Sequence, residues 1–591
     1  RLGSILSYMQ MALSIVIGLI YTPVMIKLLG QSEYGLYNTV SSTISMLSLL
    51  SLGFNSGYIR YYARYKVKKD QEAIWRLNGL FLLIFSIISI IALMAGLYLS
   101  GHLSIIFDAG LTGREYEIAR VLMILSTISL AISFINSVFN SIISAHEKFI
   151  FQKIISMLTT VVSPLITLPL LLLGYRSIAL VLISLILTSV GTIINAYYIF
   201  SKLQQKFYLK KVEGKLFVEL FSYTAFIAVN MLIDQINWNI DKLLLGRFRG
   251  TAEVAIYSVG FSIYSYYQSF SVSVSGVFTP RIHQIINLTD KGSKEQKNRL
   301  TEIFVKVGRI QYLVLGLVAT GFALFGYFFI TRIWAGKEYN ISYYVAVMLM
   351  IPATIPLIQN LGIEIQRAEN QHQFRSIIYS LMAIINLGLS IILCQIYGAL
   401  GSAIGTAISL VVANGIIMNI YYQKKCNIDI IVFWKNIIKM SCKSLVFAIV
   451  FIAFFIFVNF GFYKFNKIAL IKDLNIFAFV FLGTAILLIE SAYKNEKAST
   501  CANGLETLAM AIFTLILPYV YQIHKNEFIK TIKYAGMVVG VYYIIKMIIV
   551  FLGNKKKYLR SKEDFIKDEE PDSEFDDDDD DDEDDEFDDL E

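Results

Sequence analysis

Two carboxylates, Asp234 and Asp241, lie inside a long apolar segment near residues 217–245. Their spacing of seven residues places them on one face of a helix, together with Asn237 and Trp238. A charged group at membrane depth is costly, and it usually faces a water-filled cavity or pairs with a partner. We expect Asp234 to face a cavity, because no base lies next to it on its own helix. Asp241 either shares that cavity or pairs with an adjacent base at the lipid boundary.

Four arginines lie where apolar segments end. Arg60 and Arg64 close the second predicted segment, Arg281 closes the eighth and Arg367 the tenth. A planar guanidinium group donates two parallel hydrogen bonds and therefore suits phosphate. These arginines would attract an anionic head group to one mouth of a pathway. The alternative is the ordinary excess of basic residues in cytoplasmic loops.

Hydroxyl side chains recur on two of the apolar segments. Three serines of the second segment match three of the eighth at one constant offset: Ser42, Ser45 and Ser51 match Ser262, Ser265 and Ser271. Small polar residues commonly pack transmembrane helices together, and packing alone explains these serines. The alternative is that the same faces, with Asn55, Tyr264 and Gln268, line a route and bind sugar hydroxyls.

The sequence contains no pattern typical of an enzyme or a metalloprotein. Its five histidines are scattered, no glycine loop with a lysine could cradle a phosphate, and no Cys/His spacing suits zinc. The four cysteines, Cys394, Cys426, Cys442 and Cys501, have no paired spacing, so we interpret them as structural. We expect no catalytic residues, no cofactor, no metal site and no nucleic-acid partner.

Composition requires lipid as the solvent for most of the chain. Of the 591 residues, 56% are hydrophobic and only 16% are charged, and the mean hydropathy is +0.60. Stretches of roughly 20 apolar residues can cross a membrane as helices. Twelve such stretches lie near 5–28, 36–58, 77–100, 119–143, 154–173, 178–200, 217–245, 254–280, 310–331, 341–361, 376–397 and 402–422. Weaker candidates near 440–461, 474–490, 506–524 and 533–552 bring the expected total to 14–16 spans of an all-α polytopic membrane protein.

The part of the chain before residue 425 contains one pattern twice. Residues 28–37 (LLGQSEYGLY) correspond to residues 244–257 (LLGRFRGTAEVAIY). Each copy has six predicted crossings, an even number, so both copies enter the membrane from the same side and form a parallel repeat. The sequence therefore predicts two six-helix lobes, followed by two to four additional helices.

Four parts of the chain follow from this pattern: an N-terminal lobe (1–205), a C-terminal lobe (206–425), additional transmembrane helices (426–553) and a cytoplasmic acidic tail (554–591). From Asp564 to Glu591 the tail is mostly Asp and Glu, and such a run repels itself and stays disordered. Lys and Arg are concentrated in the even-numbered connections, which places the N-terminus in the cytoplasm. The sequence begins at Arg1 without an initiator methionine and shows no cleavable signal peptide, so we expect a few residues to precede it.

In order and spacing, several segments resemble the polysaccharide or oligosaccharide flippases of O-antigen type, within the multidrug/oligosaccharidyl-lipid/polysaccharide exporter superfamily. The resemblance covers roughly residues 1–490. In the first half it rests on residues 22–23 (TP), 29–35 (LGQSEYG), 53–55 (GFN) leading to Arg60, and 145–149 (AHEKF). In the second half it rests on residues 241–246 (DKLLLG), 367–370 (RAEN) and 397–404 (YGALGSAI).

This resemblance implies two lobes around a cationic cavity that opens alternately to either face of a bacterial plasma membrane. The implied cargo is a polyprenyl-diphosphate-linked oligosaccharide, moved outward while its prenyl tail stays in membrane lipid. A sodium or proton gradient or the membrane potential would drive it, with Asp234 and Asp241 as the coupling residues. Glycosyltransferases and a polysaccharide polymerase are the implied protein partners. The implied head-group site comprises Arg60, Arg64, Arg281, Arg367, Asn55, Tyr264 and Gln268.

Two other functions remain open at this point. A multidrug and toxin extrusion antiporter shares the two-lobe plan, but it carries cations and would favour acidic residues in its cavity. A non-transporting scaffold for envelope assembly would use the extra helices and the acidic tail. A membrane glycosyltransferase is disfavoured, because every loop of the duplicated region is short.

Overall fold

The computed structural model describes residues 2–51, 53–108, 111–208, 214–275, 278–290, 292–369 and 371–441. These residues form helices and connecting turns, and no strand occurs among them. The predicted spans near 474–490, 506–524 and 533–552, nearly all of the span near 440–461, and the acidic tail lie outside the described residues.

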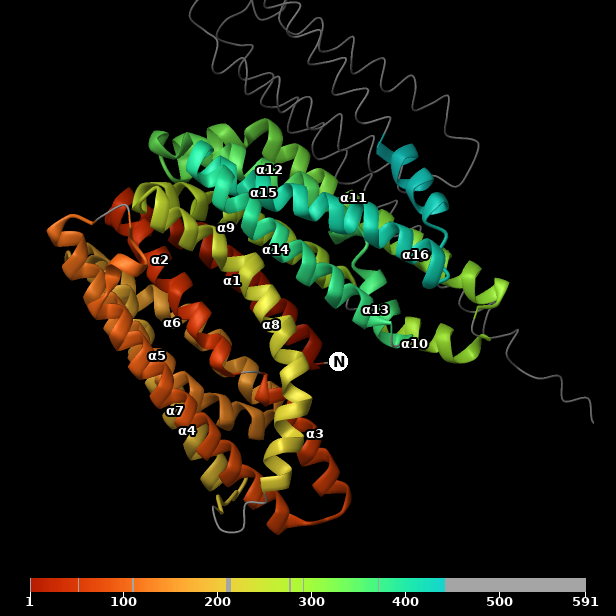
Figure 1. Cartoon of the computed structure of the whole chain (residues 1–591), viewed down its shortest axis with the longest axis horizontal. Helices are drawn as coiled ribbons and strands as arrows, with labels where there is room; N and C mark the ends of the chain where they lie inside the picture. Colours follow the sequence, from red (N-terminus) through yellow and green to blue (C-terminus); the bar gives the residue numbers. More distant parts are fainter. Residues whose placement is uncertain are drawn as a thin grey trace, which may run out of the picture. The chain divides into compact units, whose positions relative to one another are not determined.

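The first part of the chain forms seven α-helices (Figure 1). They are α1 (Leu2–Leu29), α2 (Gln31–Leu47), α3 (Phe54–Val67), α4 (Gln71–Gly101), α5 (Gly113–Ala145), α6 (Phe149–Leu172) and α7 (Arg176–Ser201). Helix α5 packs against α4 and α7, and α1 packs against α6. Aromatic and aliphatic side chains of α3, α4 and α5 form a buried apolar cluster around Phe81 and Phe85.

The second part of the described chain begins with α8 (Gly214–Phe248) and α9 (Thr251–Ser275). Further along are α10 (Thr279–Leu288), α11 (Lys294–Phe328), α12 (Asn340–Ile358), α13 (Leu361–Ala368), α14 (His372–Tyr397), α15 (Ala399–Leu410) and α16 (Asn419–Lys425). A π-helical segment, η3 (Phe329–Trp334), extends α11, and another, η5 (Val411–Met418), joins α15 to α16. The largest cluster of buried apolar side chains lies here and includes the end of α1.

Nine helical segments of the described chain are long and apolar enough to cross a membrane. They coincide with nine of the twelve spans predicted before residue 425. The other three predicted spans, near 36–58, 217–245 and 254–280, are largely helical but are not among these nine. The expectation of an all-α, multi-pass membrane protein is thus confirmed for the described residues.

The second predicted span, near 36–58, is not one continuous helix. Helix α2 ends at Leu47, a 3₁₀ turn covers Ser48–Ser51, and α3 begins after Gly53. Gly53 has a φ of 68°, a left-handed conformation that glycine adopts without a Cβ clash. The expectation that this span ends at Arg60 is therefore wrong, because Arg60 lies inside α3.

Two glutamates cap equivalent helices in the two parts. The carboxylate of Glu33, in the first turn of α2, accepts a hydrogen bond of 2.9 Å from the backbone N–H of Ser177 at the start of α7. Likewise Glu253, in the first turn of α9, accepts one of 2.8 Å from the N–H of Ala399 at the start of α15. A carboxylate at a helix N-terminus pairs with N–H groups that have no partner within the helix. The matched caps support the predicted duplication.

Two aromatic stacks repeat in the same way. The rings of Phe151 and Tyr198 stack with centroids 4.0 Å apart and planes inclined by 15°. The rings of Phe374 and Tyr421 stack at 4.1 Å and 7°. The two members of each pair have the same separation along the chain, so the stacks align α6 with α14.

Candidate functional site

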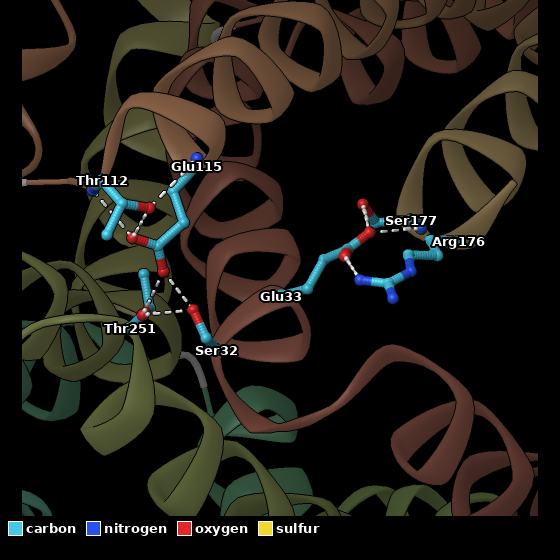
Figure 2. A network of polar contacts seen from close by, with 7 residues as sticks. All are labelled: Ser32, Glu33, Thr112, Glu115, Arg176, Ser177 and Thr251. Atoms are coloured by element: carbon cyan, nitrogen blue, oxygen red, sulfur yellow. Dashed lines mark hydrogen bonds and ion pairs between the residues drawn. The ribbon is translucent and has the colours of Figure 1, made fainter. Parts of the chain in front are cut away.

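Three side chains join the two parts of the chain at the end that the charge distribution predicts to be outside (Figure 2). We call Ser32, Glu115 and Thr251 the outer latch. Ser32 donates its hydroxyl to Oε1 of Glu115, and its Oγ lies 3.2 Å from Oγ1 of Thr251. The Thr251 hydroxyl also donates to Oε1 of Glu115, at 3.5 Å. One carboxylate thus accepts hydroxyls from α2 and from α9.

A helix cap holds this carboxylate in place. Oε2 of Glu115 accepts hydrogen bonds from the backbone N–H of Thr112, at 2.9 Å, and from its hydroxyl, at 2.8 Å. Thr112 in turn accepts the N–H of Glu115, so the two residues form a capping box at the start of α5. The latch is therefore built on a fixed helix end.

Neighbouring residues of α2 point in opposite directions. Figure 2 shows Ser32 directed to Glu115 and Glu33 directed to the start of α7. The Glu33 carboxylate accepts the Ser177 hydroxyl at 2.6 Å and pairs with the Arg176 guanidinium at 3.3 Å. The first turn of α2 is thereby fixed to α7 on one side and held by the latch on the other.

Close backbone approach accompanies the latch. Helix α2 packs against α8 and α9, and a Cβ on Gly35 would lie 1.8 Å from the Thr251 carbonyl oxygen. A Cβ on Gly246 would lie 2.8 Å from the Thr39 side chain. On α1, the Leu19 carbonyl accepts a 3.1 Å hydrogen bond from the buried Trp334 indole. The backbones of α2 and α9 can therefore approach each other this closely only because residue 35 is glycine.

Asp241 lies in a buried polar cluster between α8, α9, α14 and α15. It is 2% exposed, and its Oδ2 accepts hydrogen bonds from the hydroxyls of Tyr257, at 2.7 Å, and Thr406, at 2.9 Å. Within the described part of the chain, its Oδ1 has no hydrogen-bond partner. Thr406 also contacts Asn386, which accepts the Ser390 hydroxyl at 3.4 Å. A carboxylate, an amide and three hydroxyl groups therefore gather around a single site.

Lys242, the base adjacent to Asp241, interacts with its charge and also lies over an aromatic ring. The ammonium group of Lys242 lies 4.7 Å from the centroid of the Phe261 ring. The other predicted coupling residue, Asp234, belongs to α8 by its backbone, but its side chain lies outside the described residues, as does that of Asn237.

The four predicted head-group arginines are all exposed. Arg60 and Arg64 lie on α3, whereas Arg281 lies in the first turn of α10 and Arg367 on α13. The expectation that Arg281 and Arg367 end spans is wrong, because each belongs to a separate short helix. Helices α10 and α13 pack against each other, and Arg367 pairs with Glu364 at 2.8 Å.

The predicted polar lining residues belong to two helices, α3 and α9. Tyr264 is buried against aromatic rings, with its ring centroid 5.6 Å from that of Phe261. Gln268 is half-buried one turn further along α9. Asn55 of α3 accepts the Ser141 hydroxyl at 3.2 Å.

A cavity that the sequence analysis missed lies among α1, α5, α6 and α7. Its volume is about 640 Å³, and sixteen residues line it. A signal for it exists in the sequence, since polar residues follow helical spacing on three segments, as in Ser133, Asn136 and Asn140 of α5. These residues carry no charge, so they do not stand out in an apolar segment as Asp234 or Asp241 does.

The family model described as polysaccharide biosynthesis protein matches residues 3–286. The solved structure of a lipid II flippase, MurJ, in an inward closed conformation is 16% identical, with a TM-score of 0.60, and covers 83% of this chain and 100% of its own. A transporter of the MOP superfamily from Pyrococcus furiosus is 14% identical, with a TM-score of 0.50, covering 72% of this chain and 96% of its own. No curated protein sequence matches the chain.

A mutant of the Vibrio cholerae MATE transporter VcmN has the same TM-score and identity, and covers 72% of this chain and all of its own. At these identities the likeness concerns the fold alone. The chain has the fold of a flippase-type membrane transporter, and its first half matches a polysaccharide biosynthesis family.

A Gly35→Ala substitution tests the close approach beside the latch. The added Cβ would collide with the Thr251 carbonyl, so we expect the outer end to stay open. A cysteine that replaces the buried Thr251 should then react faster with a membrane-impermeant maleimide. The matched control is Gly388→Ala in α14, where a Cβ meets no atom within 4 Å. Equal labelling of Thr251→Cys in both backgrounds would contradict a closure that depends on Gly35.

Proposed function

We propose, on the premise that residues 3–286 match the polysaccharide biosynthesis protein family, that this chain is a flippase. It moves a polyprenyl-diphosphate-linked oligosaccharide from the cytoplasmic to the outer leaflet of a bacterial plasma membrane, with its N-terminus in the cytoplasm. The family match in a chain with a transporter fold is the observation that carries the proposal. Carrying a diphosphate and several sugars through hydrocarbon without a protein would cost many kcal/mol, because single charges there already cost several.

The outer latch supports an alternating mechanism. Its hydrogen bonds join hydroxyls to one carboxylate, and each such bond contributes only about 0.5–1.5 kcal/mol net, or up to about 3 kcal/mol with a charged acceptor. Water can replace these partners when α2 and α9 separate. Two six-helix lobes that part here, after cargo has entered from the cytoplasmic end, would release it outward.

The exposed arginines supply the attraction for the diphosphate. Helices α3 and α10 each follow a span, at the end predicted to be cytoplasmic. Helix α3 carries Arg60 and Arg64, and α10 carries Arg281. In this proposal they bind the head group first, and Arg367 joins them by exchanging Glu364 for a phosphate oxygen. Asn55, Tyr264 and Gln268 then offer hydrogen bonds along the route.

The Asp241 cluster is the proposed coupling site. Hard cations prefer oxygen ligands, and coupling ions of membrane transporters bind at buried oxygen-rich sites of this kind. The second carboxylate oxygen of Asp241 has no partner among the described residues, and Thr406, which donates to the first oxygen, also lies 3.5 Å from the Asn386 side-chain oxygen. A sodium ion or a proton would satisfy that oxygen, and Asp234 would share this role.

A second candidate function is a multidrug and toxin extrusion antiporter. The buried carboxylate of Asp241 favours it, because a cation carrier needs acidic groups within the membrane. The arginines and the family match favour the flippase. The two functions differ in cargo, because the flippase moves a lipid-linked oligosaccharide and the antiporter exports small cations.

Reconstitution in proteoliposomes tests the function and the coupling site together. A fluorescent polyprenyl-diphosphate oligosaccharide is placed in one leaflet, and its appearance in the other is followed with and without a sodium or proton gradient. We expect gradient-dependent movement that Asp241→Asn abolishes, because the amide removes the negative charge that binds the ion. The exposed Asp290→Asn serves as the control and should move the probe normally. Export of small cationic dyes without lipid movement would favour the antiporter.

The arginines receive their own test in the same vesicles. We expect Arg60→Ala and Arg281→Ala each to abolish lipid movement while leaving membrane insertion intact, because a phosphate contact is lost. Arg299→Ala, which removes another exposed arginine with an ion pair on its own helix, should leave transport unchanged. Normal transport by both Arg60→Ala and Arg281→Ala would remove the cationic mouth from the mechanism.

A further inference from the structure

The cavity among α1, α5, α6 and α7 is polar but carries no charge. None of its sixteen lining residues is Asp, Glu, Lys or Arg, and all but four have a hydroxyl or an amide group. Its volume of about 640 Å³ lies within the roughly 300–1,000 Å³ typical of ligand sites. A cavity of this kind suits an uncharged ligand that forms hydrogen bonds.

The lining amides are arranged as donors and acceptors beside open space. Asn195 of α7 donates to Oδ1 of Asn136 at 2.8 Å and to Oδ1 of Asn140 at 3.3 Å. Gln152 of α6 donates to the Asn140 carbonyl at 2.8 Å. Each amide has more hydrogen-bonding positions than these contacts use, since it offers two donors and an acceptor with two lone pairs.

The cavity also departs from the pattern of the second half of the chain. In the alignment set by the two aromatic stacks, Gln152 and Ser156 of α6 correspond to Arg375 and Tyr379 of α14. There Arg375 donates to the Tyr379 hydroxyl at 2.6 Å, and Tyr379 donates to Asn414. Two larger side chains that bond each other thus occupy the positions of Gln152 and Ser156.

Gly191 of α7 keeps the chamber open on another side. A Cβ built there would meet no atom within 4 Å, although Gly191 lines the cavity. Glycine inside a helix costs about 0.5–1 kcal/mol relative to alanine, and no close contact with a neighbouring helix requires it here. An absent side chain at this point leaves room for a ligand.

The chemistry of the lining selects among ligand classes. An organic cation would need a carboxylate, and a phosphate or a sugar acid would need an arginine or a lysine, and the lining offers neither. A neutral sugar ring carries hydroxyls that both donate and accept, which is what serine, threonine, asparagine and glutamine side chains match. The face of Tyr21, another lining residue, suits the apolar C–H face of such a ring.

We propose that this cavity is a binding site for neutral sugar rings of the cargo, separate from the arginines that bind its diphosphate. The identity of the ligand as part of the cargo rests on the proposed function, whereas sugar binding itself is measured without transport. The site would favour neutral hexoses and N-acetylated sugars over sugar acids.

Equilibrium binding to the full chain in lipid nanodiscs tests the proposal with two fluorescent probes. One is a polyprenyl diphosphate carrying a neutral oligosaccharide, and the other is the same polyprenyl diphosphate without sugar. We expect the wild-type protein to bind the sugar-bearing probe at least tenfold more tightly. Gly191→Leu, which fills the cavity, should remove this preference, and so should Ser156→Tyr, which places the second-half residue in the first half.

Gly388→Leu is the matched control, because it adds the same side chain at an equally open glycine of α14 outside the cavity. It should keep the wild-type preference, and near-wild-type binding of the sugar-free probe by all variants would show that they are folded. Equal binding of both probes by the wild type, or an unchanged preference in both filled variants, would overturn the proposal.

Transport of the same probe separates this inference from the proposed function. Suppose that the wild type prefers the sugar-bearing probe, that the filled variants lose this preference, and that the wild type moves no lipid. This result would refute the flippase and support sugar binding in the cavity. Lipid movement that is equally fast in the wild type and in both filled variants would refute the cavity and support the flippase.

Discussion

The hydrocarbon core of a membrane offers no water, so every polar group within it must find a partner in the protein. Two buried groups of the described helices illustrate this constraint. Asn78 of α4 is fully buried, and it accepts the Tyr58 hydroxyl at 2.6 Å and donates to the Lys206 carbonyl at 3.1 Å. Asp241 is held by two hydroxyls in the same way. Polar side chains that remain next to open space, as in the uncharged cavity, therefore indicate a place for water or a ligand.

The same constraint explains how the two parts of the chain meet and how they could separate. At the outer latch, contact depends on three polar side chains and on a glycine that lets two backbones touch. Apolar side chains of both parts pack beside it, and its hydrogen bonds can be exchanged for water at the membrane surface. Glu33 and Arg176 hold α2 to its own half, so α2 would move as part of that half. A transporter needs halves that stay firm and a junction whose polar contacts can be exchanged.

Much of this architecture could be predicted from the sequence, because hydrophobic length and repetition are strong signals. Nine predicted spans and the fold class were confirmed, and the matched caps at Glu33 and Glu253 support the duplication. The break at Gly53 and the short helices α10 and α13 were missed, because such breaks depend on local backbone geometry. The cavity escaped notice because no single residue marks it; it results from small side chains on three helices facing one another. The partners of Asp241 come from segments far apart in the chain, which periodicity cannot reveal.

The central claim is that lipid-linked oligosaccharide crosses only when the outer latch opens. The most direct measurement is transport by a Ser32→Cys/Thr251→Cys double variant in proteoliposomes, because the two side-chain oxygens lie 3.2 Å apart and sulfurs at these positions come within reach of a disulfide. The account predicts lipid movement under reducing conditions, arrest on oxidation and recovery on reduction, with neither single variant affected by the oxidant. Movement that continues in the fully cross-linked protein, or no movement of the lipid by the reduced protein, would contradict it.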